Sequence, residues 1–195
     1  MIVATKRNTA LPDAESAYKG HREAVHRSTV MAFRKMDASR FAPLTITSIT
    51  EHALSSFRSQ WNHGVRFVDW AWEDELLTWR KKRPSYWDMA IWHKQTLCGL
   101  ALGGPSRRRS RLYIEGIEAN PENNPFKSLI IPIALMASER YAETIKSKEV
   151  WLVEPTGALV DIYIQAGYTV RPPNKFLAKI LRAKTFATKV VGASV

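Results

Sequence analysis

Apolar and polar positions between residues 87 and 119 follow a pattern that predicts three consecutive β-strands. Two short apolar runs, Asp88–Trp92 and Thr96–Leu102, are separated by a polar stretch of hairpin-loop length, so we expect them to pair antiparallel. Gly103–Ser106 should break the chain, and a two-residue alternation resumes over Arg111–Ala119. Together the three segments predict a meander.

A helical period begins at Leu129. The residues that share its apolar face are Leu129, Ile133, Met136, Ala137 and Tyr141. Glu149–Val153 follows and is typical of a short buried strand. Because a helix crosses back before it, this strand can run parallel to the end of the meander, which predicts a mixed sheet.

A second helix is bounded by Thr156 as N-cap and by Gly167 at the left-handed C-cap position. Its apolar stripe consists of Leu159, Ile162, Tyr163 and Ala166. Residues 168–170 and Phe176–Leu181 can supply the last two strands, although the second run fits a basic helix equally well.

The N-terminal third predicts one strand and three helices. The strand is Leu44–Ile49, and the helices are Ala14–Arg34, His52–Trp61 and Asp69–Lys82. His21 and His26 are five positions apart and do not share a helical face as two metal ligands would. We therefore expect surface histidines and no metal site.

Composition indicates one domain of 195 residues, with 45% apolar content as ample material for a core. Neither a bilayer-spanning run nor a secretion signal is visible, so we expect a cytoplasmic protein without membrane contact. Cys98 is the only cysteine, which excludes an intramolecular disulfide and a cysteine-based zinc cluster. Its apolar strand predicts a small buried side chain rather than a nucleophile.

The net charge of +11 is concentrated at the ends of the chain. Residues 1–42 carry eight Lys and Arg against four Asp and Glu, residues 43–170 carry 15 against 14, and residues 171–195 carry six against none. Such basic termini can bind tRNA or another nucleic acid, although solvated basic tails without a partner are common.

Two arginine clusters and a group of tryptophans have ordinary structural explanations. Arg107–Arg111 is a basic turn, where a solvated hairpin tip is favoured over a phosphate contact. Arg80–Arg83 ends a predicted helix, where cations complement the dipole. The tryptophans between Trp61 and Trp92 favour packing in a core or groove over stacking on bases.

This order of elements, ending in Tyr163–Tyr168, resembles the core of the GCN5-related N-acetyltransferase family over residues 43–182. The resemblance implies an α/β (α+β) fold with a mixed, mostly antiparallel sheet flanked by helices. It implies acetyl transfer from acetyl-coenzyme A to a primary amine of a small molecule, a protein or an aminoacyl-tRNA. Residues 1–42 would form a basic helical extension, and residues 183–195 a basic tail.

The resemblance also implies site residues. The helices after the first strand would form the acceptor groove, placing Trp70, Trp72 and Trp79 near the substrate. Ile117 and Ala119 lie at a strand ending that resembles the family's splayed strand, whose backbone groups hold the pantetheine arm.

The family's R-x-x-G-x-G/A phosphate loop has no glycine counterpart between Glu122 and Ile131, and Pro132 lacks an amide proton. The cofactor's phosphates would then be held by Phe126, Lys127, Ser128 and Leu129, with Lys127 supplying charge and Ser128 hydroxyl and amide donation. The alternative is that Phe126 and Leu129 fill the space that a phosphate would occupy.

Three residues are candidates for the chemistry. Tyr163 stands where the family places a tyrosine that can protonate the coenzyme A sulfur, although it also belongs to an apolar stripe. Glu115 and Glu118 are candidate bases. Their odd separation predicts opposite faces of the strand, so that only one lines the groove and Glu115 shares a face with Ile117.

A second hypothesis comes from the missing glycines. The chain would then be a catalytically degenerate module of the same fold, binding nucleic acid or a protein through its basic ends and Trp-rich groove. A homodimer is left open under either hypothesis.

Overall fold

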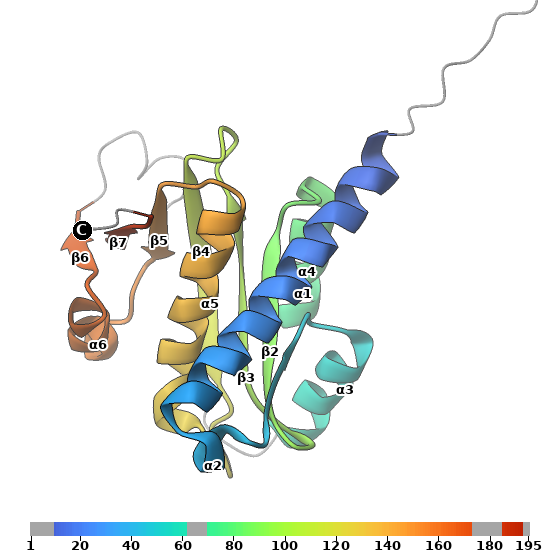
Figure 1. Ribbon diagram of the computed structural model, residues 1–195, viewed down its shortest axis with the longest axis vertical. Coiled ribbons are helices and arrows are strands. Elements are labelled where there is room, and N and C mark those ends of the chain that lie inside the picture. The colour runs from blue at the N-terminus through green and yellow to red at the C-terminus, as the bar shows by residue number, and fades with distance from the viewer. Residues whose placement is uncertain (1–9, 62–69, 173–184, 193–195) are drawn as a thin grey trace, which may run out of the picture.

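The computed structural model describes residues 10–61, 70–172 and 185–192. Within them, seven strands form one sheet in the order β1-β2-β3-β4-β5-β7-β6 (Figure 1). The strands are β1 Leu44–Thr47, β2 Trp87–His93, β3 Thr96–Pro105, β4 Arg111–Ala119, β5 Glu149–Val153, β6 Thr169–Arg171 and β7 Phe186–Val190. Only β4 and β5 pair in parallel, so the predicted mixed, mostly antiparallel sheet is confirmed.

Helices cover both faces of this sheet (Figure 1). They are α1 Ala10–Met36, α2 Ala38–Phe41, α3 Glu51–Gln60, α4 Trp72–Lys82, α5 Ile130–Thr144 and α6 Val160–Gln165; short 3-10 turns, η1 Lys127–Leu129 and η2 Gly157–Leu159, lead into the last two. On one face, Val25 of α1 and Ile133 of α5 share a core with Met89 of β2. On the other, Leu54 of α3 and Leu76 of α4 pack against Ala90 of the same strand.

The N-terminal helix is part of the core. Arg22 is buried, lies 3.5 Å from the Asp88 carboxylate and donates to the Tyr86 carbonyl at 3.0 Å. His26 is buried too, with its Nε2 at 3.0 Å from the Asp88 carbonyl, and burial lowers its pKa to about 4. The expectation of a surface position for His26 was therefore wrong, because it shares the buried face of the helix with Arg22 and Thr29.

The predicted break at Gly103–Ser106 was also wrong. Strand β3 continues to Pro105 because its glycines accommodate close neighbours. A Cβ on Gly104 would lie 2.4 Å from the Trp79 ring, so this glycine lets an indole from α4 lie against the strand.

Residues 186–190, which the sequence assigned to a basic tail, form β7 between β5 and β6. Phe186, Ala187 and Thr188 are buried, and Lys189 donates to Glu139 and to the Ala166 carbonyl at about 3 Å. The strand has too few apolar side chains to produce a recognisable alternation. Phe176–Leu181 lies outside the described residues.

Among the residues that the structure describes, none of the helices is long and apolar enough to cross a bilayer.

Candidate active site

The site begins at a bulge in β4. Along the pairing with β3, Leu102 is opposite Gly116 and Gly103 is opposite Ile114, which leaves Glu115 without a partner. A one-residue bulge of this kind shifts the alternation of side chains. Ile114 and Ile117 therefore both pack toward α5, although they are three positions apart.

Because of the bulge, Glu115 and Glu118 lie on the same side of the sheet as α4. The pKa of Glu115 responds to charges on that helix, and Glu118 accepts a hydrogen bond from Trp72 at its start. The predictions that these carboxylates face opposite sides, that only one lines the groove and that Glu115 shares a face with Ile117 were wrong. The isolated Gly116 inside the alternating run was the signal for the bulge.

Strands β4 and β5 separate just beyond the bulge. Their parallel pairing ends at Ile114 and Leu152, and from there the edge of β4 has no strand partner in the described chain. A cavity of about 290 Å³ opens in the gap. Its lining residues are Trp70, Trp72, Ile114, Glu115, Gly116, Ile117, Glu118, Leu152, Val153, Glu154, Pro155, Thr156, Leu159 and Tyr163.

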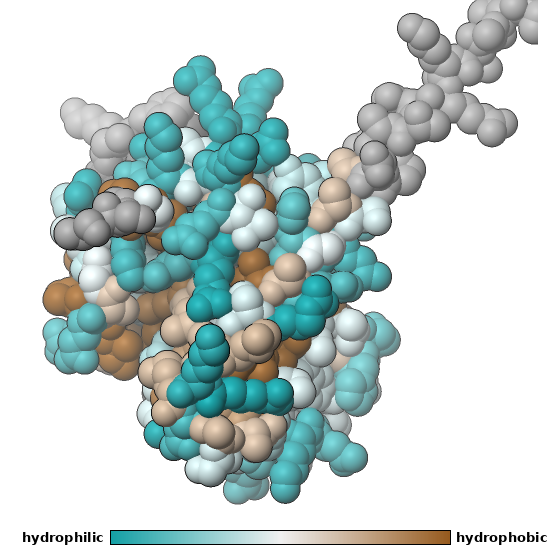
Figure 2. Space-filling view, in the orientation of Figure 1, coloured by the Kyte–Doolittle hydropathy of each residue, from teal (hydrophilic) through white to brown (hydrophobic). Residues whose placement is uncertain are grey.

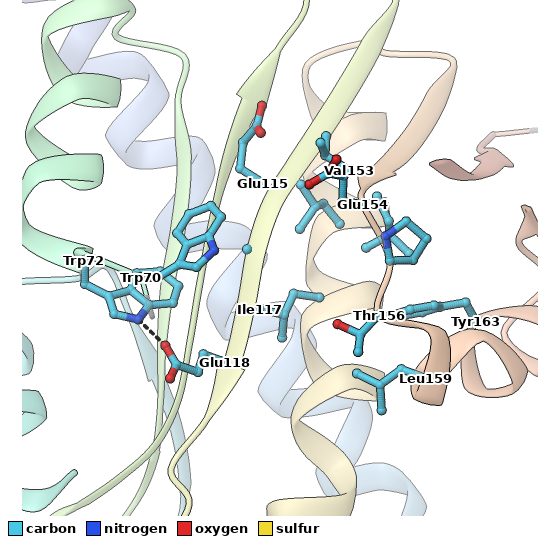
Figure 3. Close-up of a pocket in the computed structure, with 14 residues that line it drawn as sticks. Trp70, Trp72, Glu115, Ile117, Glu118, Val153, Glu154, Thr156, Leu159 and Tyr163 are labelled. Carbon is cyan, nitrogen blue, oxygen red and sulfur yellow. Dashed lines mark hydrogen bonds between the residues drawn. The ribbon is translucent and has the colours of Figure 1, made fainter. Parts of the chain in front are cut away.

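Two walls of different chemistry enclose this cavity, which we call the cleft (Figure 3). Trp70, Trp72 and the two carboxylates of β4 lie on one side, and Thr156, Leu159 and Tyr163 lie on the other, with Ile117 between them. A Cβ on Gly116 would lie 2.9 Å from the Trp70 ring, so the glycine allows the indole to pack against the strand.

The two carboxylates differ in their surroundings. Burial raises the pKa of Glu115 to about 7, with a smaller contribution from Glu75 and an opposing one from Lys82. Glu115 can therefore gain or lose a proton near neutral pH. Glu118 is buried, and Trp72 Nε1 donates to its Oε2 at 2.6 Å, which fixes the carboxylate in place.

Tyr163 lies between the cleft and the hydrophobic core. Its side chain lines the cleft and belongs to the cluster packed around α5, so the two roles suggested by the sequence are compatible. Burial raises its pKa to about 12. The phenol therefore keeps its proton throughout the neutral range and can act as a hydrogen-bond donor.

The loop between β4 and α5 is held together by two asparagines. Asn120 Nδ2 donates to the Leu97 carbonyl at 2.9 Å, and Asn124 Nδ2 donates to the Cys98 carbonyl at 2.7 Å. The backbone amides of Phe126, Lys127 and Leu129 all donate within the loop, to Asn124 Oδ1, the Asn124 carbonyl and the Phe126 carbonyl. These amides do not form an anion cradle.

Most residues predicted to hold the cofactor lie away from the cleft. Phe126 is buried, with its ring centroid 5.9 Å from that of Phe41, while Lys127 and Ser128 are exposed. Leu129 packs against the core. Since α5 begins at Ile130, Pro132 falls in its first turn, where the helix needs no amide proton.

Of the remaining candidates, Ile117 lines the cleft and Ala119 packs against the core. Trp70 and Trp72 line the cleft, whereas Trp79 lies against Gly104. The wall formed by residues 152–156 and Leu159 was not predicted from the sequence. A polar, proline-containing segment directly after a buried strand was the available signal.

Cys98 is buried, as predicted, and burial raises the pKa of its thiol to about 11. It therefore remains a protonated thiol.

Comparison with solved structures shows the class of fold. Ard1 from Thermoplasma volcanium superposes with a TM-score of 0.53 at 14% identity, covering 76% of this chain and 98% of its own. The yncA protein of Salmonella typhimurium, solved with acetyl-CoA, gives 0.52 at 16% identity, covering 78% and 96%. The PaiA N-acetyltransferase of Thermoplasma acidophilum, solved with coenzyme A, gives 0.50 at 13% identity, covering 75% and 98%.

The chain thus has the fold of the GCN5-related N-acetyltransferases, as its sequence predicted. No protein-family model and no curated protein matches the sequence.

Proposed function

We propose that this protein is an acetyl-CoA-dependent N-acetyltransferase that acts on a primary amine. The observation that supports the proposal best is the cleft at the β4 bulge, with carboxylates on one wall and a buried tyrosine on the other. Amine acylation needs both an acceptor for the ammonium proton and a donor to the departing sulfur.

Acetyl-CoA supplies an activated acyl carbon when it is bound. Glu115 is the favoured base, because its raised pKa matches a proton acceptor that works near neutrality. Glu118, fixed by Trp72, is the second candidate and adds negative charge beside the position of the amine. Tyr163 donates a hydrogen bond to the sulfur as charge develops on it.

The described residues fit the pantetheine arm of acetyl-CoA better than its pyrophosphate. The free edge of β4 around Ile117 can accept a narrow pantetheine arm. In the loop around Asn124, the amides of Phe126, Lys127 and Leu129 donate within the loop, so these three are not available to a pyrophosphate. We infer that the arm contributes most of the binding and that exposed Lys127 and Ser128 add a weak, solvent-screened attraction.

The lining of the cleft favours a cationic acceptor. Three carboxylates, Glu115, Glu118 and Glu154, and two indoles line it, and none of its described lining residues is Lys, Arg or His. Carboxylates and aromatic faces both attract an ammonium group. A small polyamine or a protein amine therefore suits the cleft better than a polyanion.

Release of free thiol from acetyl-CoA tests the proposal, with spermidine and a lysine-containing peptide as acceptors. Activity that depends on the amine supports it, and Glu115→Gln should lower kcat/KM by about 10²- to 10⁴-fold at pH 8. Absence of both turnover and acetyl-CoA binding would instead favour a degenerate module of the same fold, which the missing glycines between Glu122 and Ile131 already make the second candidate.

A further inference from the structure

A second hollow lies at the other end of β4, between the β3–β4 hairpin, the turn after α4 and the side of α1. It measures about 390 Å³ and is lined by Tyr18, Arg83, Ser85, Ser106, Arg107 and Arg109, together with one proline. Three arginines from two separate turns therefore converge on one hollow whose described lining contains no carboxylate.

The hairpin that carries two of these arginines is rigidly held. The Arg109 amide donates to the Ser106 carbonyl, and the Ser106 amide donates to the Arg111 carbonyl, both at 2.8 Å. From the turn after α5, Ser147 Oγ donates to the Arg109 carbonyl at 2.6 Å, and the Lys148 amide donates to the Ser110 carbonyl at 2.9 Å. These bonds fix the backbone of the turn, and the side chains of Arg107 and Arg109 at its tip are exposed.

The guanidinium groups retain donors for a ligand. Arg83 donates to the Pro105 carbonyl and Arg109 to the Tyr18 hydroxyl, each with one of five N–H groups. Arg107 is exposed, and its side chain makes no hydrogen bond or ion pair with another described residue. Within the described chain, none of the three is paired with a carboxylate, whereas neighbouring Arg111 is paired with Glu149 at 2.9 Å.

Positive charge extends beyond the hollow. Arg108, Lys146 and Lys148 are exposed on the two turns that meet here. Figure 2 shows long hydrophilic side chains projecting from the hairpin end of the molecule. A single small anion would engage only part of this surface, whereas a chain of phosphates can engage all of it.

We propose that this hollow binds the phosphate backbone of a single-stranded nucleic acid. Guanidinium forks match phosphate oxygens in bidentate geometry. The Tyr18 ring borders the hollow, 5.8 Å from the His21 ring, and offers an aromatic surface for an unpaired base. The site is separate from the cleft and does not depend on acetyl transfer; it also differs from the basic termini that the sequence suggested.

Two charge reversals test the proposal. Arg107→Glu changes the hollow, while Lys94→Glu makes the same change in net charge at the exposed tip of the β2–β3 hairpin. Neither side chain supports the fold, so thermal unfolding of both variants should match that of the wild type. Binding is measured by fluorescence anisotropy with a labelled single-stranded RNA of about 20 nucleotides, over a range of salt concentrations.

We expect saturable binding to the wild type and about tenfold weaker binding to Arg107→Glu. The slope of log affinity against log salt concentration should be reduced by about 0.7 for each phosphate contact that Arg107→Glu loses. Lys94→Glu should change the affinity by less than about twofold. Equal weakening by both variants, or no saturable binding, overturns the proposal. Poly-glutamate that competes as well as RNA of equal charge overturns the assignment to a nucleic acid. Acetyl-CoA binding by Arg107→Glu should be unchanged, which separates this test from that of the cleft.

Discussion

Replacing Glu115 by glutamine should stabilise the protein at alkaline pH and have almost no effect in acid. The pKa of Glu115 is about 7 in the folded protein, against the ordinary value of 4.5. Between pH 4.5 and pH 7, Glu115 therefore keeps its proton in the folded state, whereas the unfolded chain has already released it. Consequently the free energy of unfolding falls as pH rises from 4.5 to 7, and it stays lower above 7.

The size of the change in the free energy of unfolding follows from the difference between the folded and unfolded pKa of Glu115. One pKa unit corresponds to about 1.4 kcal/mol, so ionisation of Glu115 costs the folded state about 3 kcal/mol at pH 8 and about 0.2 kcal/mol at pH 4. Glutamine is neutral and nearly isosteric, so it avoids this penalty. The variant should gain most of that free energy at pH 8, reduced by any rearrangement around the amide.

Urea unfolding, followed by tryptophan fluorescence at pH 4 and pH 8, measures the difference directly. Glu143→Gln is the matched control, because Glu143 is an exposed carboxylate on α5. The control should change stability equally at the two pH values. If Glu115→Gln behaves like the control, Glu115 titrates as an ordinary carboxylate and the argument from its burial is wrong.

Two further predictions concern the cofactor. Tyr163→Phe should lower kcat by about 10²- to 10⁴-fold while leaving acetyl-CoA affinity nearly unchanged, and normal turnover in steady-state assays would leave Tyr163 with a packing role only. Lys127→Ala should weaken coenzyme A binding by less than about 1 kcal/mol, as for an exposed charge. A loss of about 1.5 to 3 kcal/mol in calorimetry would mean that Lys127 is a specific phosphate ligand after all.

Much of the fold was predictable from periodicity. The runs that became β2, β3 and β4 have the apolar content of strands, and α5 has a complete apolar stripe, so burial dictates these elements directly. Strand β7 was missed because Thr188 and Lys189 interrupt its apolar residues. Strand β7 is placed by its pairing with β5, and the local pattern of apolar residues does not reveal that pairing.

The shape of the site was harder to predict. The bulge at Glu115 changes which face the residues before it share with the residues after it, and only Gly116 indicated the bulge. The asparagines of the β4–α5 loop act through contacts with Leu97 and Cys98, which are distant in sequence. The surroundings of His26 likewise depend on tertiary contacts with β2.

Acetyl-CoA binding shows whether the cleft at the β4 bulge is the cofactor site. Thr156→Trp places a large ring at an exposed position on the cleft wall, and Gln165→Trp adds the same ring to α6 outside the lining. Calorimetry should give saturable binding to the wild type and to Gln165→Trp, and at least about tenfold weaker binding to Thr156→Trp, a loss of about 1.4 kcal/mol or more. No binding to the wild type at millimolar acetyl-CoA, or undiminished binding to Thr156→Trp, would contradict the account.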